Sequence, residues 1–149
     1  MTEGPEAARV SVADLQERAV DLEALEALAH AVLVAEGEPS AQLSVAVVDD
    51  ERMSELHERY SGVPGPTDVL SFPLDDGPGP QELLGEVVVS SDTAAREALE
   101  RGLPFEEELQ RYVVHGILHL VGYDDQEPAE RERMHARQEA LLAEFRAQP

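Results

Sequence analysis

Apolar residues recur along the chain at two different intervals, and the interval predicts the element. Alternation or a short continuous apolar run is typical of a strand, whereas spacings of three and four residues are typical of a helix with one buried face. The strand pattern occurs at residues 9–12, 43–48, 68–72 and 85–90. The helical pattern begins near residues 21, 49, 91, 104 and 128, and the last such segment ends near residue 145.

The order of these segments predicts an α+β fold. We expect a small mixed four-stranded sheet packed with about five helices, in a single domain over residues 1–149. Residues 1–8 are polar and should be frayed, and residues 75–80, rich in Asp, Gly and Pro, should form a solvated loop. The sequence shows neither a signal peptide nor an apolar run near the roughly 20 residues that span a bilayer, so a soluble cytoplasmic protein without membrane association is expected.

Two histidines, His115 and His119, stand four residues apart in the segment that begins near residue 104. Positions i and i+4 share one face of a helix, so both imidazoles can reach one metal ion. Gly122 favours the left-handed conformation that ends a helix, and Asp125 beyond it can supply a third ligand, although a turn or capping role is also open. Three protein ligands leave a position for water or substrate, as in catalytic zinc sites. Gly116 costs about 1 kcal/mol relative to alanine inside a helix, which indicates a close approach of another backbone.

Three stretches, taken together, carry a resemblance to a known family. The run HGILHLVGYDD at residues 115–125 resembles the HGxLHLxGYDH signature of the YbeY endoribonuclease family. Residues 66–73, PTDVLSFP, are similar to that family's PTDVLSFP segment, and residues 84–89, LGEVVV, to its LGDIVI strand. The resemblance extends from about residue 9 to the end of the chain, and it implies an α+β metallohydrolase with residues 66–73 along one wall of a cleft beside the metal helix.

The resemblance also implies a function. It predicts a metal-dependent, single-strand-specific endoribonuclease that acts in 16S rRNA 3′-end maturation and ribosome quality control. One Zn²⁺ per chain would be held by His115, His119 and Asp125. The expected partners are the rRNA precursor and the small ribosomal subunit, with a ribosomal protein or a GTPase as a further partner.

The chain departs from the family pattern at two positions. Asp125 stands where the signature has histidine; aspartate is an accepted zinc ligand, but two histidines and a carboxylate also suit iron(II), so another divalent metal stays open. Ser61 stands where the family has an arginine near the substrate, and serine cannot replace a guanidinium that binds phosphate in a bidentate way. Arg59 and Arg111 are the candidates for that charge. Arg111 lies four residues before His115, on the same side of the helix.

Charge argues against broad affinity for nucleic acid. Asp and Glu number 32 against 11 basic residues, all of them arginine, which gives a net charge of −21. Such a chain repels RNA at long range. Screening over about 10 Å at 0.1 M salt lets nearby groups and a bound metal dominate within a cleft. The acidity therefore favours a partner that helps to present the substrate.

Two other classes of function remain as alternatives. A metallopeptidase of the HExxH type carries its general base directly after the first histidine, where this chain has Gly116, so peptide hydrolysis is disfavoured. A non-catalytic ribosome-assembly factor with a structural metal gains weight from the departures at Ser61 and Asp125. Metal-dependent turnover separates an enzyme from such a factor.

Overall fold

The computed structural model describes residues 9–74 and 83–148. These residues form four strands and five helices, which confirms the predicted α+β class. In chain order the elements are β1 (Arg9–Leu15), α1 (Leu22–Ala35), β2 (Gln42–Val48), α2 (Asp50–Ser61), β3 (Val69–Pro73), β4 (Leu83–Ser90), α3 (Ser91–Arg101), α4 (Phe105–Leu120) and α5 (Pro128–Arg146). Residues 1–8, predicted to be frayed, and 75–80, predicted to form a loop, lie outside the described part. No helix in the described part is long and apolar enough to cross a membrane.

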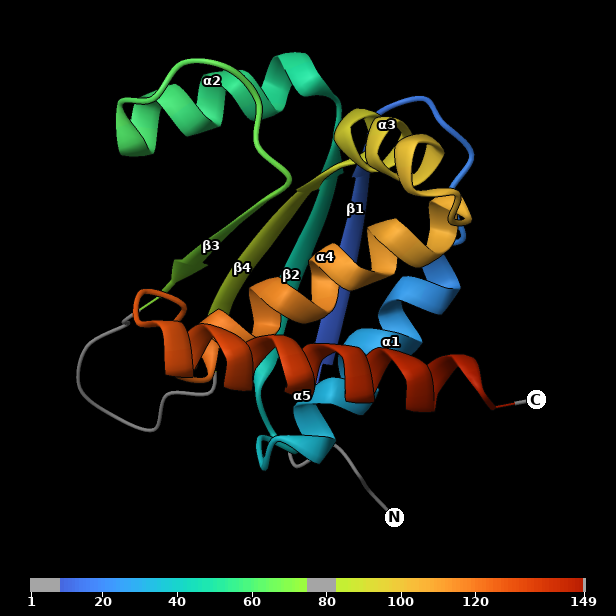
Figure 1. Cartoon of the computed structure of the whole chain (residues 1–149), viewed down its shortest axis with the longest axis vertical. Coiled ribbons are helices and arrows are strands. Elements are labelled where there is room, and N and C mark those ends of the chain that lie inside the picture. Colours follow the sequence, from blue (N-terminus) through green and yellow to red (C-terminus); the bar gives the residue numbers. More distant parts are fainter. Residues whose placement is uncertain (1–8, 75–82, 149) are drawn as a thin grey trace.

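The sheet is mixed, as the sequence predicted. β1, β2 and β4 pair in parallel, and β3 joins the far edge of β4 in the antiparallel direction, giving the order β1-β2-β4-β3 (Figure 1). β1 pairs with β2 as far as Leu15, three residues beyond the predicted end. Its last three residues are all exposed, so no apolar alternation marks them in the sequence.

Helices cover both faces of the sheet. Val45 and Val47 of β2 point to the face covered by α1 and α4, whereas Ala46 and Val48 point to the face that packs on Met53 of α2. α5 packs against α4 on the side away from the sheet (Figure 1). The helix with the histidine pair is therefore held between the sheet and α5.

Gly116 seats α4 against the sheet. A Cβ atom at Gly116 would lie 2.6 Å from Cγ1 of Val87 and 3.1 Å from Cγ2 of Val69, and the hydroxyl of Ser71 donates to the Gly116 carbonyl oxygen at 3.0 Å. Gly116 is therefore closely approached, but by side chains, whereas the sequence predicted another backbone. Its partners are mainly valine side chains of β3 and β4 rather than backbone, because the helix lies across the pleated face of the sheet.

Candidate metal centre

The chain leaves α4 through a turn that sends it back toward the histidines. Gly122 has φ +112°, and its N–H donates to the carbonyl oxygen of His119 at 3.2 Å, while the N–H of Tyr123 donates to that of Leu118 at 2.9 Å. This pair of hydrogen bonds is the Schellman motif, which favours glycine at the left-handed position. The reversed chain then carries Asp125 to the end of the helix where the histidines lie.

His115, His119 and Asp125 converge at one point. Oδ2 of Asp125 lies 3.4 Å from Nε2 of His119 and 3.9 Å from Nε2 of His115, and the three candidate ligand atoms all lie within 4.8 Å of one another. Tetrahedral zinc with bonds of about 2.0–2.2 Å places its ligand atoms about 3.4 Å apart. Small side-chain movements would therefore close these three groups on one ion, and the donor set fits zinc or another divalent metal.

Asp124 and Asp125, the adjacent acidic residues of the turn, make different side-chain contacts. Oδ1 of Asp124 accepts the N–H of Gln126 at 3.2 Å, which is a turn contact. α5 begins at Pro128 without a side-chain hydrogen bond at its N-cap, Glu127, so the carboxylate of Asp125 does not cap that helix. The capping alternative for Asp125 thus finds no support in these contacts, and its carboxylate faces the histidines.

The three residues stand where two clefts meet. A cleft of about 820 Å³ runs between α3, α4 and α5, and one of about 520 Å³ runs between α4 and β3. Asp68, His115 and Asp125 line both. Residues 68–71 and 73 line the smaller cleft, so the segment from 66 to 73 contributes a wall as predicted. Between 29% and 42% of each of the three side chains is exposed, which leaves the cluster open to a substrate.

A protein-family sequence model matches nearly the whole chain. The family described as Endoribonuclease YbeY matches residues 10–146. The chain belongs to the YbeY endoribonuclease family. An "Endoribonuclease YbeY" of Anaeromyxobacter sp. is 49% identical over 115 residues, which are 77% of this chain and 59% of that relative. One of Aquifex aeolicus is 44% identical over 119 residues, 80% of this chain and 79% of the relative.

The YbeY-family chain also has a relative among solved structures. The solution structure of TM1509 from Thermotoga maritima superposes with a TM-score of 0.63 and 29% identity, covering 93% of this chain and 88% of that one. Its agreement supports the α+β architecture described above. The chain spans only about three fifths of the length of the Anaeromyxobacter relative, and four fifths of the Aquifex one.

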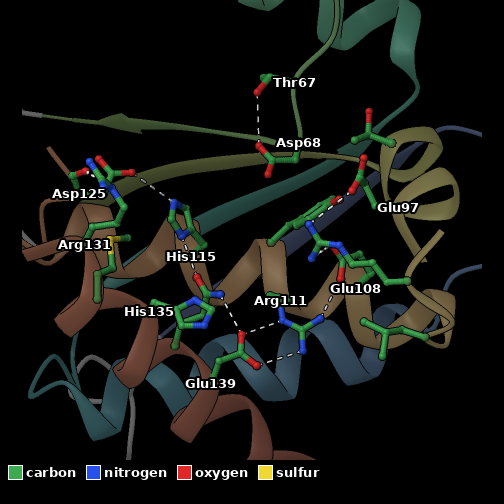
Figure 2. Close-up of a pocket in the computed structure, with 16 residues that line it drawn as sticks. Thr67, Asp68, Glu97, Glu108, Arg111, His115, Asp125, Arg131, His135 and Glu139 are labelled. Atoms are coloured by element: carbon green, nitrogen blue, oxygen red, sulfur yellow. Dashed lines mark hydrogen bonds and ion pairs between the residues drawn. The ribbon is translucent and has the colours of Figure 1, made fainter. Parts of the chain in front are cut away.

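Arg111 is enclosed by carboxylates. Its guanidinium donates to Glu108 at 2.7 Å and to both oxygens of Glu139 at 2.8 and 3.1 Å (Figure 2). It also donates to Glu107 at 3.0 Å. These bonds engage all three of its nitrogens, and only 15% of the side chain is exposed. They raise the pKa of Arg111, with the hydrogen bonds to Glu139 as the largest cause. The same contacts lower the pKa of Glu139, which is therefore a carboxylate at neutral pH.

Arg59, the other predicted phosphate ligand, lies on the exposed side of α2. It lines neither of the two clefts that contain His115. In this YbeY-family chain, the structure brings together the three predicted metal ligands. Arg59 lies away from them, and Arg111 lines the larger cleft with its guanidinium enclosed by carboxylates.

Two residues near the cluster were missed by sequence reasoning. Arg131 donates to the carbonyl oxygen of Asp125 at 3.1 Å and lines the larger cleft, and Oε1 of Gln138 lies 2.7 Å from Nδ1 of His115. Both come from α5, whose placement beside α4 no local pattern specifies. The only sequence signal was their position on a helix that follows the Asp125 turn.

Proposed function

We propose that this chain is a metal-dependent endoribonuclease that cleaves single-stranded RNA. The observation that carries the proposal is the open cluster of His115, His119 and Asp125 at the junction of two clefts, in a chain whose relatives are named endoribonucleases. The cleft volumes are in the range of small-ligand pockets, which suits a few unstacked nucleotides. The substrate we assign is the 3′ end of the 16S rRNA precursor in the cytoplasm, in the small ribosomal subunit, with a ribosomal protein or GTPase presenting it.

The metal we assign is zinc, with another divalent ion as the alternative because the third ligand is a carboxylate. A divalent ion held by the cluster supplies Lewis acidity toward a phosphodiester. The protein's own part is to orient both imidazoles on one helix face, to carry Asp125 on the Schellman turn, and to hold the RNA backbone in the cleft.

Arg131 is the residue we assign to the RNA phosphate. Arg101, Arg111 and Arg131 line the larger cleft. Arg101 pairs with Glu97 and Glu108, and Arg111 is enclosed by three glutamates. Within the described residues Arg131 has no carboxylate partner and donates only to carbonyl oxygens of the Asp125 turn. Its charge is therefore available to a phosphate beside the cluster.

The alternatives have less support. A structural zinc site is closed by four protein ligands, whereas the candidates here number three among the described residues and are partly exposed. A peptidase would need a glutamate at Gly116, where even a Cβ atom would lie 2.6 Å from Val87. The geometry thus supports an open reaction site and disfavours peptide hydrolysis.

Metal removal tests the proposed activity. We expect the purified protein to cleave a single-stranded RNA carrying the 3′ end of the 16S rRNA precursor, to lose cleavage after treatment with a chelator, and to regain it when Zn²⁺ is added. The same sequence annealed into a duplex serves as the control and should remain intact. No cleavage by folded, zinc-loaded protein would favour the assembly-factor alternative.

Arg131→Gln tests the phosphate contact. We expect the KM for RNA to rise about 10- to 100-fold, because one charge-assisted hydrogen bond contributes about 1.5–3 kcal/mol and about 1.4 kcal/mol corresponds to tenfold. Zinc affinity, measured by chelator competition, should stay within about twofold. If instead zinc affinity falls and KM does not rise, Arg131 acts through the Asp125 turn and does not bind phosphate.

A further inference from the structure

The imidazole rings of His115 and His119 differ in their hydrogen-bond partners. Nδ1 of His115 lies 2.7 Å from Oε1 of Gln138, a side chain of α5 that is only 6% exposed. None of the described residues hydrogen-bonds Nδ1 of His119. A neutral imidazole carries one proton, and a metal can bind only the nitrogen that lacks it. For Nε2 of His115 to face a metal with its lone pair, Nδ1 must carry the proton.

The orientation of the Gln138 amide is fixed by its neighbour. Nε2 of Gln138 donates to Oε2 of Glu139 at 3.0 Å. A carboxylate only accepts hydrogen bonds, so turning the amide over would set its oxygen against a carboxylate oxygen. Oε1 must therefore face His115, and the ring nitrogen opposite it must be the donor.

Glu139 is itself held by a cation from α4. Nε and Nη2 of Arg111 bind its two carboxylate oxygens, and the pKa of Glu139 is lowered mainly by these hydrogen bonds. Figure 2 shows the resulting chain of contacts from Arg111 through Glu139 and the amide to His115. It leaves α4 at Arg111, crosses to α5, and returns to α4 one turn later. Arg111 donates to Glu139, Glu139 accepts from the Gln138 amide, and the amide oxygen accepts from His115. Reversing one of these hydrogen bonds would therefore set two acceptors against each other.

We propose that Gln138 is a positioning residue that holds His115 in the tautomer with the proton on Nδ1 and the lone pair of Nε2 directed toward Asp125. The inference rests on the proposed metal site. It assigns Arg111 and Glu139 to the orientation of the amide. Partners of this kind on metal-binding histidines typically change metal affinity by about 10- to 100-fold.

The tautomer of His115 can be measured without metal or RNA. In metal-free protein labelled with ¹⁵N-histidine, long-range ¹H–¹⁵N correlation spectra in mildly alkaline buffer should show the His115 ring protonated on Nδ1. The other rings provide the comparison within the same spectrum. A His115 ring protonated on Nε2 in the unaltered protein would overturn the proposal, whether or not any variant folds.

Gln138→Met tests the effect on metal binding. Methionine is similar in size but offers no comparable acceptor, so zinc affinity measured by chelator competition should fall about 10- to 100-fold, with the His115 tautomer shifting toward Nε2–H. Arg133→Gln is the matched control. It changes an exposed arginine of α5 that lies outside the chain of contacts and lines neither cleft with His115, and it should leave both readouts unchanged. Zinc affinity in Gln138→Met within about twofold of the unaltered protein would contradict the proposal.

These readouts separate the two proposals. If the protein binds zinc and His115 has the expected tautomer, but RNA is not cleaved, the endoribonuclease proposal fails and the role of Gln138 stands. If RNA is cleaved and Gln138→Met binds zinc normally, only the role of Gln138 fails. If the unaltered protein binds neither zinc nor another divalent ion, the endoribonuclease proposal fails, and the metal-free spectrum alone decides the role of Gln138.

Discussion

The His119→Ala protein should bind zinc at least about 100-fold more weakly than the unaltered protein and should not cleave RNA above background. Structural zinc sites with four ligands bind with about 10–16 kcal/mol, or about 3 kcal/mol per ligand, and about 1.4 kcal/mol corresponds to tenfold. The side chain is about one third exposed, so its removal should change the stability of the metal-free protein by less than about 1 kcal/mol. Chelator competition, RNA cleavage and urea unfolding measure the three quantities.

Matched variants make this result specific. His30→Ala removes an exposed histidine of α1 that is not part of the cluster, and it should retain both zinc binding and cleavage. Asp125→Ala should lose zinc affinity as His119→Ala does, whereas Asp125→His, which restores the residue of the family signature, should retain it. Full zinc affinity in Asp125→Ala would show that Asp125 is a turn residue only. Cleavage at the normal rate by His119→Ala would contradict the proposed metal centre.

The parts of the site that the sequence predicted are local. His115 and His119 share a face through helical spacing alone, and the Gly122 turn that returns Asp125 is closed by hydrogen bonds between residues three and five apart. A pattern within eleven residues therefore contained the three candidate ligands. The strands were also predicted from local patterns, namely apolar alternation and short apolar runs. The predicted end of β1 was three residues too early because its last three residues are exposed and have no apolar alternation.

The environment of the ligands depends on contacts that are distant in sequence. Arg111 was predicted to face a phosphate because it lies on the same side of α4 as His115, and that placement alone was sound. Its partner Glu139 is 28 residues away, and the partner of His115, Gln138, is 23 residues away. Sequence spacing indicates which side chains share a helix face, but not which side chains of a neighbouring helix lie opposite them.

The Arg111→Met variant separates two roles for this side chain: stabilising the buried carboxylate of Glu108 and binding RNA phosphate. Glu108, one of its partners, is only 1% exposed, so Arg111→Met would leave a buried carboxylate with Arg101 at 3.5 Å as its remaining ion-pair partner. Removing one partner of a buried ion pair costs about 3–5 kcal/mol. We expect about 3 kcal/mol in the free energy of unfolding, because Arg101 remains and Glu107 and Glu139 are partly exposed. Urea unfolding of the metal-free protein measures it.

A control and a double variant separate burial of charge from a general effect of losing an arginine. Arg18→Met removes the exposed pair with Asp92 and should cost less than about 1 kcal/mol. Adding Glu108→Gln to Arg111→Met neutralises the buried carboxylate and should recover part of the loss, since contacting residues are not additive. Had Arg111 served mainly to bind RNA phosphate, Arg111→Met would leave the unfolding free energy almost unchanged and raise the KM for RNA. That outcome would return the phosphate-binding role to Arg111 and remove it from the chain of contacts that orients His115.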